Sequence, residues 1–197
     1  GASAIAVSPD GLYLYAAGGL FGSVVVYARG ERGRLEPIQQ MNVEGAVSVA
    51  LSPPRFVPGE AAHLYVIRKF FEDEEGSLFV YERDIGSGMI ELRSSGSDVE
   101  STIAAVSPTG EHLYFLTNTS VVVYERNPAS GSLVRKGPVS LPTPCSILPC
   151  GAMAVSPNGT RLYVGYDDRL ATYSRAADGS LTLLGSRTDV DWVVGAT

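Results

Sequence analysis

Apolar and polar positions recur along this chain in one order, written four times. Each copy opens with small and aliphatic residues that lead into Ser-Pro, continues to Leu-Tyr, and reaches an apolar run that ends in Tyr, with Arg two residues later. The Ser-Pro pairs are Ser8-Pro9, Ser52-Pro53, Ser107-Pro108 and Ser156-Pro157. The Leu-Tyr pairs are Leu14-Tyr15, Leu64-Tyr65, Leu113-Tyr114 and Leu162-Tyr163. The later pairs are Tyr27 with Arg29, Tyr81 with Arg83, Tyr124 with Arg126 and Tyr173 with Arg175. Such self-similarity indicates an array of identical supersecondary units.

Each copy predicts four short strands. The first strands are residues 4–7, 48–51, 103–106 and 152–155. In the first, third and fourth copies Ser-Pro-x-Gly then predicts a tight turn, because Pro presets φ at the second position and Gly tolerates the fourth. The second strand contains Leu-Tyr, the third includes Ser-Val-Val-Val-Tyr at 23–27 and again at 120–124, and the fourth follows a second turn.

The Val-Val-Val runs predict how these sheets pack. An antiparallel strand with one wet face alternates polar and apolar residues, whereas a continuous β-branched run fits a strand that is buried on both faces. Small four-stranded sheets stacked face to face around an axis are the blades of a β-propeller. No segment has the helical spacing of apolar residues. We therefore predict an all-β propeller of four four-stranded antiparallel blades, at residues 1–44, 45–99, 100–148 and 149–194.

Residues 195–197 repeat the Gly-Ala opening of a blade, so the sequence predicts that a fifth copy begins there. We expect the chain to be a segment of a larger ring whose remaining blades lie in cis. The alternative is that a second copy of the chain closes an eight-bladed ring.

The second repeat is the longest and predicts the most variable loops, which repeat proteins often use for binding. It has an insertion within residues 53–63 and a long loop at 68–77 that contains Phe70, Phe71, Glu72 and Asp73. The two aromatic residues are interpreted as an anchor on the blade edge, with a partner contact as the alternative. We expect this loop to lie on the face of the propeller that carries the loops between blades, which we call the loop face. Three further candidate binding residues belong to the loop face, namely Asp167, Asp168 and Trp192. The carboxylates are interpreted as a solvated acidic rim rather than a calcium site, and no metal or cofactor is predicted.

Cys145 and Cys150 are the two cysteines of the chain. A disulfide between them is the favoured interpretation and implies an oxidising, extracytoplasmic compartment, while two free thiols are the alternative. The two histidines, His63 and His112, directly precede Leu-Tyr and are interpreted as solvated turn residues.

The composition argues against two classes of partner, nucleic acids and membranes. The net charge is −6, with no basic stripe, which argues against a nucleic-acid partner. Hydrophobic residues make up 45% of the chain, yet no apolar run approaches the ~20 residues of a membrane span. For the binding role, we expect a protein or a small carbohydrate-like ligand as the partner.

The motifs Gly-Ala-x-x-x-Ala-Val-Ser-Pro-Asp-Gly, Leu-Tyr and Val-x-Val-Tyr-x-Arg resemble those of the lactonase-like propellers (6-phosphogluconolactonase or YVTN type), which have seven blades. In enzymes of that family, the resemblance implies catalysis by an Arg-His pair that opens an inner strand and by a Glu four residues after the strand-two Tyr. The Arg positions here hold Ser3, Val47, Thr102 and Gly151. The His positions hold Ala4, Ser48, Ile103 and Ala152. The Glu positions hold Gly19, Lys69, Asn118 and Asp167.

A proton-transfer group must lie within hydrogen-bond reach of the substrate. Of these positions only that of Asp167 is acidic, and its own repeat holds neither the Arg nor the His of the family motif. The sequence therefore predicts a non-catalytic binding or scaffold segment of a lactonase-like repeat protein. The alternative is part of a lactone hydrolase or cycloisomerase whose catalytic residues belong to other blades.

Overall fold

The computed structural model describes residues 2–18, 22–54, 59–69, 76–96, 101–146 and 151–188, which form sixteen strands and one short 3-10 turn, η1 (Glu31–Gly33). Blade 1 consists of β1 (Ala2–Val7), β2 (Tyr13–Gly18), β3 (Ser23–Arg29) and β4 (Leu35–Asn42). Blade 2 consists of β5 (Ala46–Leu51), β6 (Ala62–Arg68), β7 (Ser77–Arg83) and β8 (Ile90–Gly96). Blade 3 consists of β9 (Ile103–Val106), β10 (His112–Leu116), β11 (Ser120–Arg126) and β12 (Leu133–Ser140). Blade 4 consists of β13 (Ala152–Val155), β14 (Arg161–Tyr166), β15 (Arg169–Arg175) and β16 (Leu181–Arg187).

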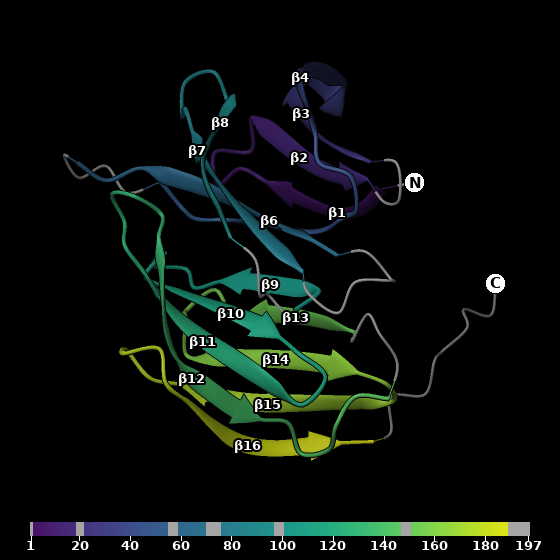
Figure 1. Ribbon diagram of the computed structural model, residues 1–197, viewed down its shortest axis with the longest axis vertical. Coiled ribbons are helices and arrows are strands. Elements are labelled where there is room, and N and C mark those ends of the chain that lie inside the picture. Colours follow the sequence, from purple (N-terminus) through teal and green to yellow (C-terminus); the bar gives the residue numbers. More distant parts are fainter. Residues whose placement is uncertain are drawn as a thin grey trace.

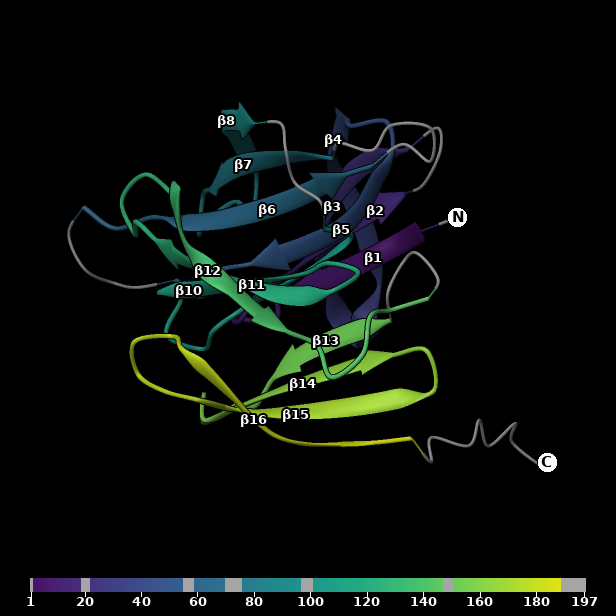
Figure 2. The same cartoon turned by 60° about the horizontal axis from the view of Figure 1, so that its bottom comes forward.

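Every blade is a meander in which each strand pairs antiparallel with the next strand in sequence (Figure 1). The first strands of successive blades contact one another, β1 with β5, β5 with β9 and β9 with β13. Figure 2 shows β1, β5 and β13 toward the centre of the arrangement and β4, β8 and β16 at its periphery. The predicted all-β propeller of four antiparallel blades is confirmed. No helix in the described parts of the chain is long and apolar enough to cross a membrane.

The serine of each Ser-Pro closes the hairpin between the first two strands. Its hydroxyl accepts the backbone N–H of the residue that precedes Leu-Tyr, at 2.8–3.1 Å in all four blades. In blade 2 this bond joins Ser52 to His63 across the insertion, so the extra residues leave the hairpin closed. The insertion ends against blade 3, where the N–H of Ala61 donates to the carbonyl of Pro128 at 3.0 Å.

A β-bulge recurs between the third and fourth strands. The register shifts at the same repeat position in each blade, between Val26 and Tyr27 in blade 1 and between Val123 and Tyr124 in blade 3. The equivalent shifts in blades 2 and 4 precede Tyr81 and Tyr173. A bulge increases the local twist of a strand pair, so each blade twists toward its rim in the same way.

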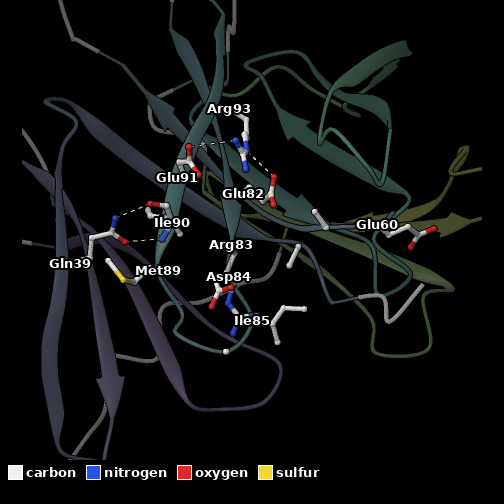
Figure 3. Close-up of a pocket in the computed structure, with 13 residues that line it drawn as sticks. Gln39, Glu60, Glu82, Arg83, Asp84, Ile85, Met89, Ile90, Glu91 and Arg93 are labelled. Carbon is white, nitrogen blue, oxygen red and sulfur yellow. Dashed lines mark hydrogen bonds and ion pairs between the residues drawn. The ribbon is translucent and has the colours of Figure 1, made fainter. Parts of the chain in front are cut away.

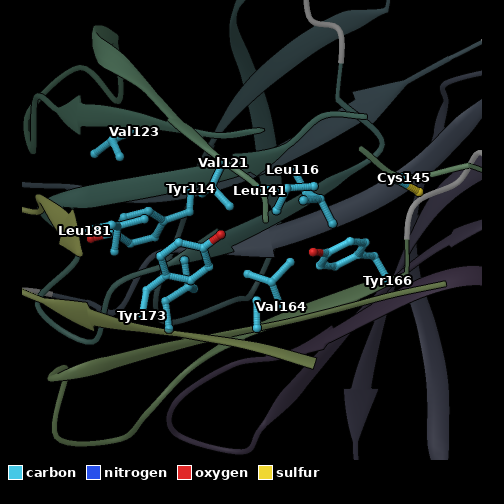
Figure 4. Packing of buried hydrophobic residues seen from close by; sticks show 12 residues of the cluster. Tyr114, Leu116, Val121, Val123, Leu141, Cys145, Val164, Tyr166, Tyr173 and Leu181 are labelled. Atoms are coloured by element: carbon cyan, nitrogen blue, oxygen red, sulfur yellow. The ribbon is translucent and has the colours of Figure 1, made fainter. Parts of the chain in front are cut away.

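The core lies between the blades. Val121 and Val123 of β11 belong to the same cluster as Val164 of blade 4 (Figure 4). Leu162 of blade 4 is part of this cluster too, whereas Tyr124 packs against blade 2. Both faces of an interior blade are therefore buried, as the valine runs predict. In blade 1, Val24 and Val26 are fully buried but Val25 is only half-buried, because no described blade covers its outer face.

Candidate functional site

The candidate residues on the loop face that the structure describes are Asp167 and Asp168, in the turn between β14 and β15. Asp167 has a positive φ of 47°, and its carboxylate accepts the backbone N–H of Ser146 at 3.1 Å. The Asp168 carboxylate lies 3.7 Å from Nε of Arg169. Asp167 thus holds the connection that leads from blade 3 to blade 4, and the side chain of Asp168 is 66% exposed.

Cys145 belongs to the same connection. Its backbone N–H donates to the carbonyl of Asn118 at 2.6 Å, and its Sγ lies 3.7 Å from Oδ1 of Asp167. Cys145 is disulfide-bonded in the structure. Cys150 lies outside the described residues, so the pairing of the two cysteines stays a prediction.

The other candidates on this face, Phe70, Phe71, Glu72, Asp73 and Trp192, also lie outside the described residues. Their roles therefore stay predictions. Among the described residues, no group of three or more His, Cys, Asp or Glu side chains could hold a metal ion.

The interpretation of the histidines as solvated turn residues is wrong. His63 is fully buried and His112 is 6% exposed, because each lies between its own blade and the next. Nδ1 of His63 lies 2.7 Å from Nη2 of Arg126, and Nδ1 of His112 lies 3.1 Å from Nη2 of Arg175. A guanidinium only donates, so Nδ1 accepts and the proton of the neutral ring is on Nε2.

These histidines belong to a contact that joins every pair of neighbouring blades, which we call the inter-blade Tyr–Arg contact. The Leu-Tyr hydroxyl of one blade accepts from Nε of the Arg that follows Val-Tyr in the next blade. The bonds join Tyr15 to Arg83 (2.6 Å), Tyr65 to Arg126 (3.0 Å) and Tyr114 to Arg175 (2.6 Å). The same hydroxyls donate to turn carbonyls of the next blade, those of Gly88 (2.8 Å), Gly131 (2.8 Å) and Gly179 (3.2 Å).

Those turn glycines are required for two reasons. Each has a positive φ of 73–83°, which L side chains rarely adopt. A Cβ at Gly131 would also lie 2.4 Å from the His63 ring, and one at Gly179 would lie 2.1 Å from the His112 ring. The turn glycine before the fourth strand therefore lets the previous blade approach closely.

Burial sets the titration of these groups. Burial, reinforced by the Arg126 charge, lowers the pKa of His63 to about 4. Burial and then the Arg175 charge lower the pKa of His112 in the same way. Burial raises the pKa of Tyr65 to about 12, so its hydroxyl keeps the proton that it donates to Gly131. Neither histidine is thus poised as a general base near neutral pH.

A cavity of about 570 Å³ opens on the wall of blade 2, lined by residues of β4, β7 and β8 and by the segment before β6 (Figure 3). Its polar groups are largely paired with one another. Arg93 bridges Glu82 and Glu91, with its Nε 2.7 Å from the Glu82 carboxylate. The Gln39 side chain donates to and accepts from the backbone of Ile90, at 2.8 and 2.7 Å. These bonds tie the outer strands of blades 1 and 2 together.

The sequence analysis does not predict that His63 and His112 bond to arginines of the next blade, although the repeat contains a signal for this contact. The position before Leu-Tyr holds Tyr13, His63, His112 and Arg161, and in the first three blades a ring packs on the turn glycine of the next blade. A planar side chain aligned with an invariant turn glycine of the next repeat indicates a contact between blades rather than a solvated turn.

The fold and these repeated contacts define a β-propeller built from equivalent blades. A family model described as "Lactonase, 7-bladed beta-propeller" matches residues 1–106, and the chain belongs to this family. A search of curated proteins found no match to this chain.

Several solved structures share the fold. One is a functionally unknown protein from Desulfotomaculum acetoxidans DSM 771, with 16% identity, a TM-score of 0.73, and coverage of 94% of this chain and 55% of that one. A protein from Lactobacillus plantarum has 19% identity and a TM-score of 0.68, over 92% and 56% of the two chains. A putative 6-phosphogluconolactonase from Bacteroides uniformis ATCC 8492 has 19% identity and a TM-score of 0.65, over 93% and 53%. The chain thus spans about half the length of these structures.

Proposed function

We propose that this chain is a non-catalytic binding or scaffold segment of a lactonase-like propeller. One observation carries the proposal: the histidines and the repeated arginines of blades 2–4 bond between blades. His63 and Arg126 face each other in a buried contact, and the lowered pKa of His63 keeps its ring neutral. The two histidines are therefore committed to holding the blades together and are not free for proton transfer to a substrate.

The loop face is the surface that we propose for a ligand, a protein or a small carbohydrate-like molecule. Asp168 is exposed there, beside the connection that Asp167 fixes to Ser146. A fixed loop presents a carboxylate at a defined place, which lowers the entropy lost on binding. The disulfide-bonded state of Cys145 supports an extracytoplasmic location, because such bonds persist in oxidising compartments.

A second candidate, part of a lactone hydrolase or cycloisomerase, is favoured by the family match and by the 6-phosphogluconolactonase among the similar folds. In that case the remaining blades of a seven-bladed ring would supply the catalytic residues in cis.

A hydrolysis assay tests the proposal. The 197-residue chain is mixed with glucono-δ-lactone or 6-phosphogluconolactone, and the protons that hydrolysis releases are titrated at constant pH. The expected rate equals that of buffer alone. A rate that rises in proportion to protein concentration would overturn the scaffold function, and Asp167→Asn would then show whether the one acidic residue at a family position takes part. For the compartment, we expect Cys145 to resist alkylation until a reductant is added, and ready alkylation without one would contradict an oxidised pair.

A further inference from the structure

The three interfaces between neighbouring blades share the inter-blade Tyr–Arg contact, but they differ in what Nη2 of the arginine meets. In the interface of blades 1 and 2, Nη2 of Arg83 donates to the carboxylate of Asp10 at 3.0 Å. In the other two interfaces, Nη2 of the repeated arginine lies 2.7 Å from Nδ1 of His63 or 3.1 Å from Nδ1 of His112. The arginine thus meets an anion at one interface and a neutral ring at the other two.

Both histidine contacts involve blade 3, which lies between blades 2 and 4 (Figure 1). Blade 3 provides Arg126 to the interface with blade 2 and His112 to the interface with blade 4. Arg126 is 3% exposed, and His63, which it faces, is fully buried. Water therefore screens these contacts little, and a change of charge there acts on both faces of one blade.

A second proton on the His63 ring would turn its contact from attraction into repulsion. Nδ1 of the neutral ring accepts from Nη2 of Arg126, whereas a protonated ring has only donors. Two cations would then lie 2.7 Å apart in a buried place, where like charges repel strongly. The closed interface therefore binds this proton less tightly than an open interface, in which water solvates both groups. The pKa of His63, which burial and then the Arg126 charge lower from 6.5 to about 4, agrees with this geometry.

The titratable groups that face His63 from its own blade do not compensate the Arg126 charge. They are Glu82 on β7, Arg93 on β8 and Tyr65 on β6. The carboxylate and the guanidinium are paired with each other at 2.7 Å. Burial raises the pKa of the tyrosine to about 12, so the tyrosine stays neutral. The turn of blade 3 on which the ring packs, residues 127–132, has no charged residue.

The groups that face His112 include more carboxylates. They are Glu111, Glu125 and Asp178, with Arg175 of blade 4, Tyr114 of the same strand and Lys136, which is paired with Glu125 at 2.9 Å. Glu111 and Glu125 favour the protonated ring, but burial and then the Arg175 charge outweigh them and lower the pKa of His112. The closed interface of blades 3 and 4 therefore also disfavours the proton.

The interface of blades 1 and 2 keeps its charges over the same pH range. Tyr13 occupies the repeat position of the two histidines there. Burial acts to raise the pKa of Asp10, but hydrogen bonds, the one from Ser8 first, lower it below 3.8. The carboxylate therefore stays charged, and paired with Arg83, while a histidine would take up a proton.

We propose that acid opens the blade array selectively, by separating blade 3 from blades 2 and 4 while blades 1 and 2 stay together. Protons on His63 and His112 are the trigger, and each interface closes again when its proton leaves. The closed form is complete above pH 6.5, the ordinary pKa of histidine, and loses stability as the pH falls below it, because the open form binds more protons. Protonation of histidines at an interface is a general mechanism of pH-sensitive switches. The inference holds whether or not the propeller is catalytic.

Amide exchange resolved by NMR measures each interface through an equivalent group. The reporters are the buried turn amides on which the rings of the preceding blade pack, those of Gly88, Gly131 and Gly179. Each of these amides donates within its own turn at 2.9–3.0 Å. Each measured rate is divided by the intrinsic exchange rate at the same pH, so that it gives the opening equilibrium.

Between pH 7 and pH 4.5 we expect the corrected rate of Gly131 to rise about tenfold or more and that of Gly179 to rise with it. The corrected rate of Gly88 should change by less than about twofold, because its interface has no histidine.

His63→Gln and His112→Gln are the matched variants, because glutamine keeps an acceptor for the arginine and takes up no proton. We expect His63→Gln to remove the acid response of Gly131 and to leave that of Gly179. His112→Gln should do the reverse.

Equal increases at all three glycines, or no increase at Gly131 and Gly179, would overturn the selective opening. So would a His63→Gln variant in which the Gly131 amide still responds to acid. The profile of the parent chain is decisive by itself, so the test does not depend on the folding of either variant.

Discussion

Arg126 and Arg29 occupy the same position of the repeat but lie in different surroundings, so the substitution of each by Met tests the inter-blade Tyr–Arg contact. Arg126 is 3% exposed, and its guanidinium donates to the Tyr65 hydroxyl and the Gly110 carbonyl, both at 3.0 Å. It also lies 2.7 Å from Nδ1 of His63. Met fills much of the volume of the apolar stem and removes the donors.

The loss in the Arg126→Met variant follows from the acceptors that it leaves behind. The carbonyl of Ala61 is a further acceptor of Nη2. A buried acceptor without a donor costs about 1–3 kcal/mol, and several of them that partly relax together cost about 3–5 kcal/mol. Arg29 is exposed, with one bond from its Nη1 to the Gly11 carbonyl at 2.7 Å. Arg29→Met should therefore cost less than about 1 kcal/mol in an isolated chain.

Urea unfolding followed by circular dichroism gives both values, at a protein concentration low enough that the midpoint no longer depends on it. The free energy of unfolding is compared at equal slope, so that only stability differs between the variants. A difference of less than about 1 kcal/mol between Arg126→Met and Arg29→Met would refute the reasoning, since the repeated arginine would then act without its neighbour blade.

The remaining predictions use the same unfolding assay or amide exchange. Gly131→Ala should cost about 3 kcal/mol or more and Gly33→Ala about 1–2 kcal/mol, since both strain a positive φ but only the first meets a ring; equal losses would contradict the close approach. The pKa of His63 in the folded chain is about 4, against 6.5 when exposed, so the unfolded chain binds more protons between these values. The free energy of unfolding should fall as pH drops from 6.5 to 4, by at most about 3 kcal/mol, and His63→Gln should flatten that slope; an unchanged slope would assign it to other groups. Asp167→Ala should speed exchange of the Ser146 amide and change the free energy of unfolding by less than about 1 kcal/mol, and unchanged exchange would show that the carboxylate does not hold this loop.

The candidate site was predictable only in part. Asp167 stands out in the sequence as the one acidic residue at a family position, but its use by the Ser146 amide depends on where the connection between blades 3 and 4 runs. Phe70 and its neighbours in the long loop of blade 2 stay predictions. The prediction that the histidines are solvated is wrong because it treats each hairpin alone. A residue before a strand is exposed in an isolated hairpin, and only the neighbouring blade buries it.

The sequence by itself determined the blade. Turn chemistry at Ser-Pro-x-Gly, the strands that contain Leu-Tyr and the length of the valine runs are local properties, because strand pairs and turns form between residues close in the chain. Only the tertiary structure decided which blades meet and what the repeated residues do. Tyr65 and Arg126, or His63 and Gly131, are more than sixty residues apart and come together because the sheets stack face to face. Identical motifs therefore differ in role: Arg126 is buried between two blades, whereas Arg29 is exposed on the outer face of blade 1.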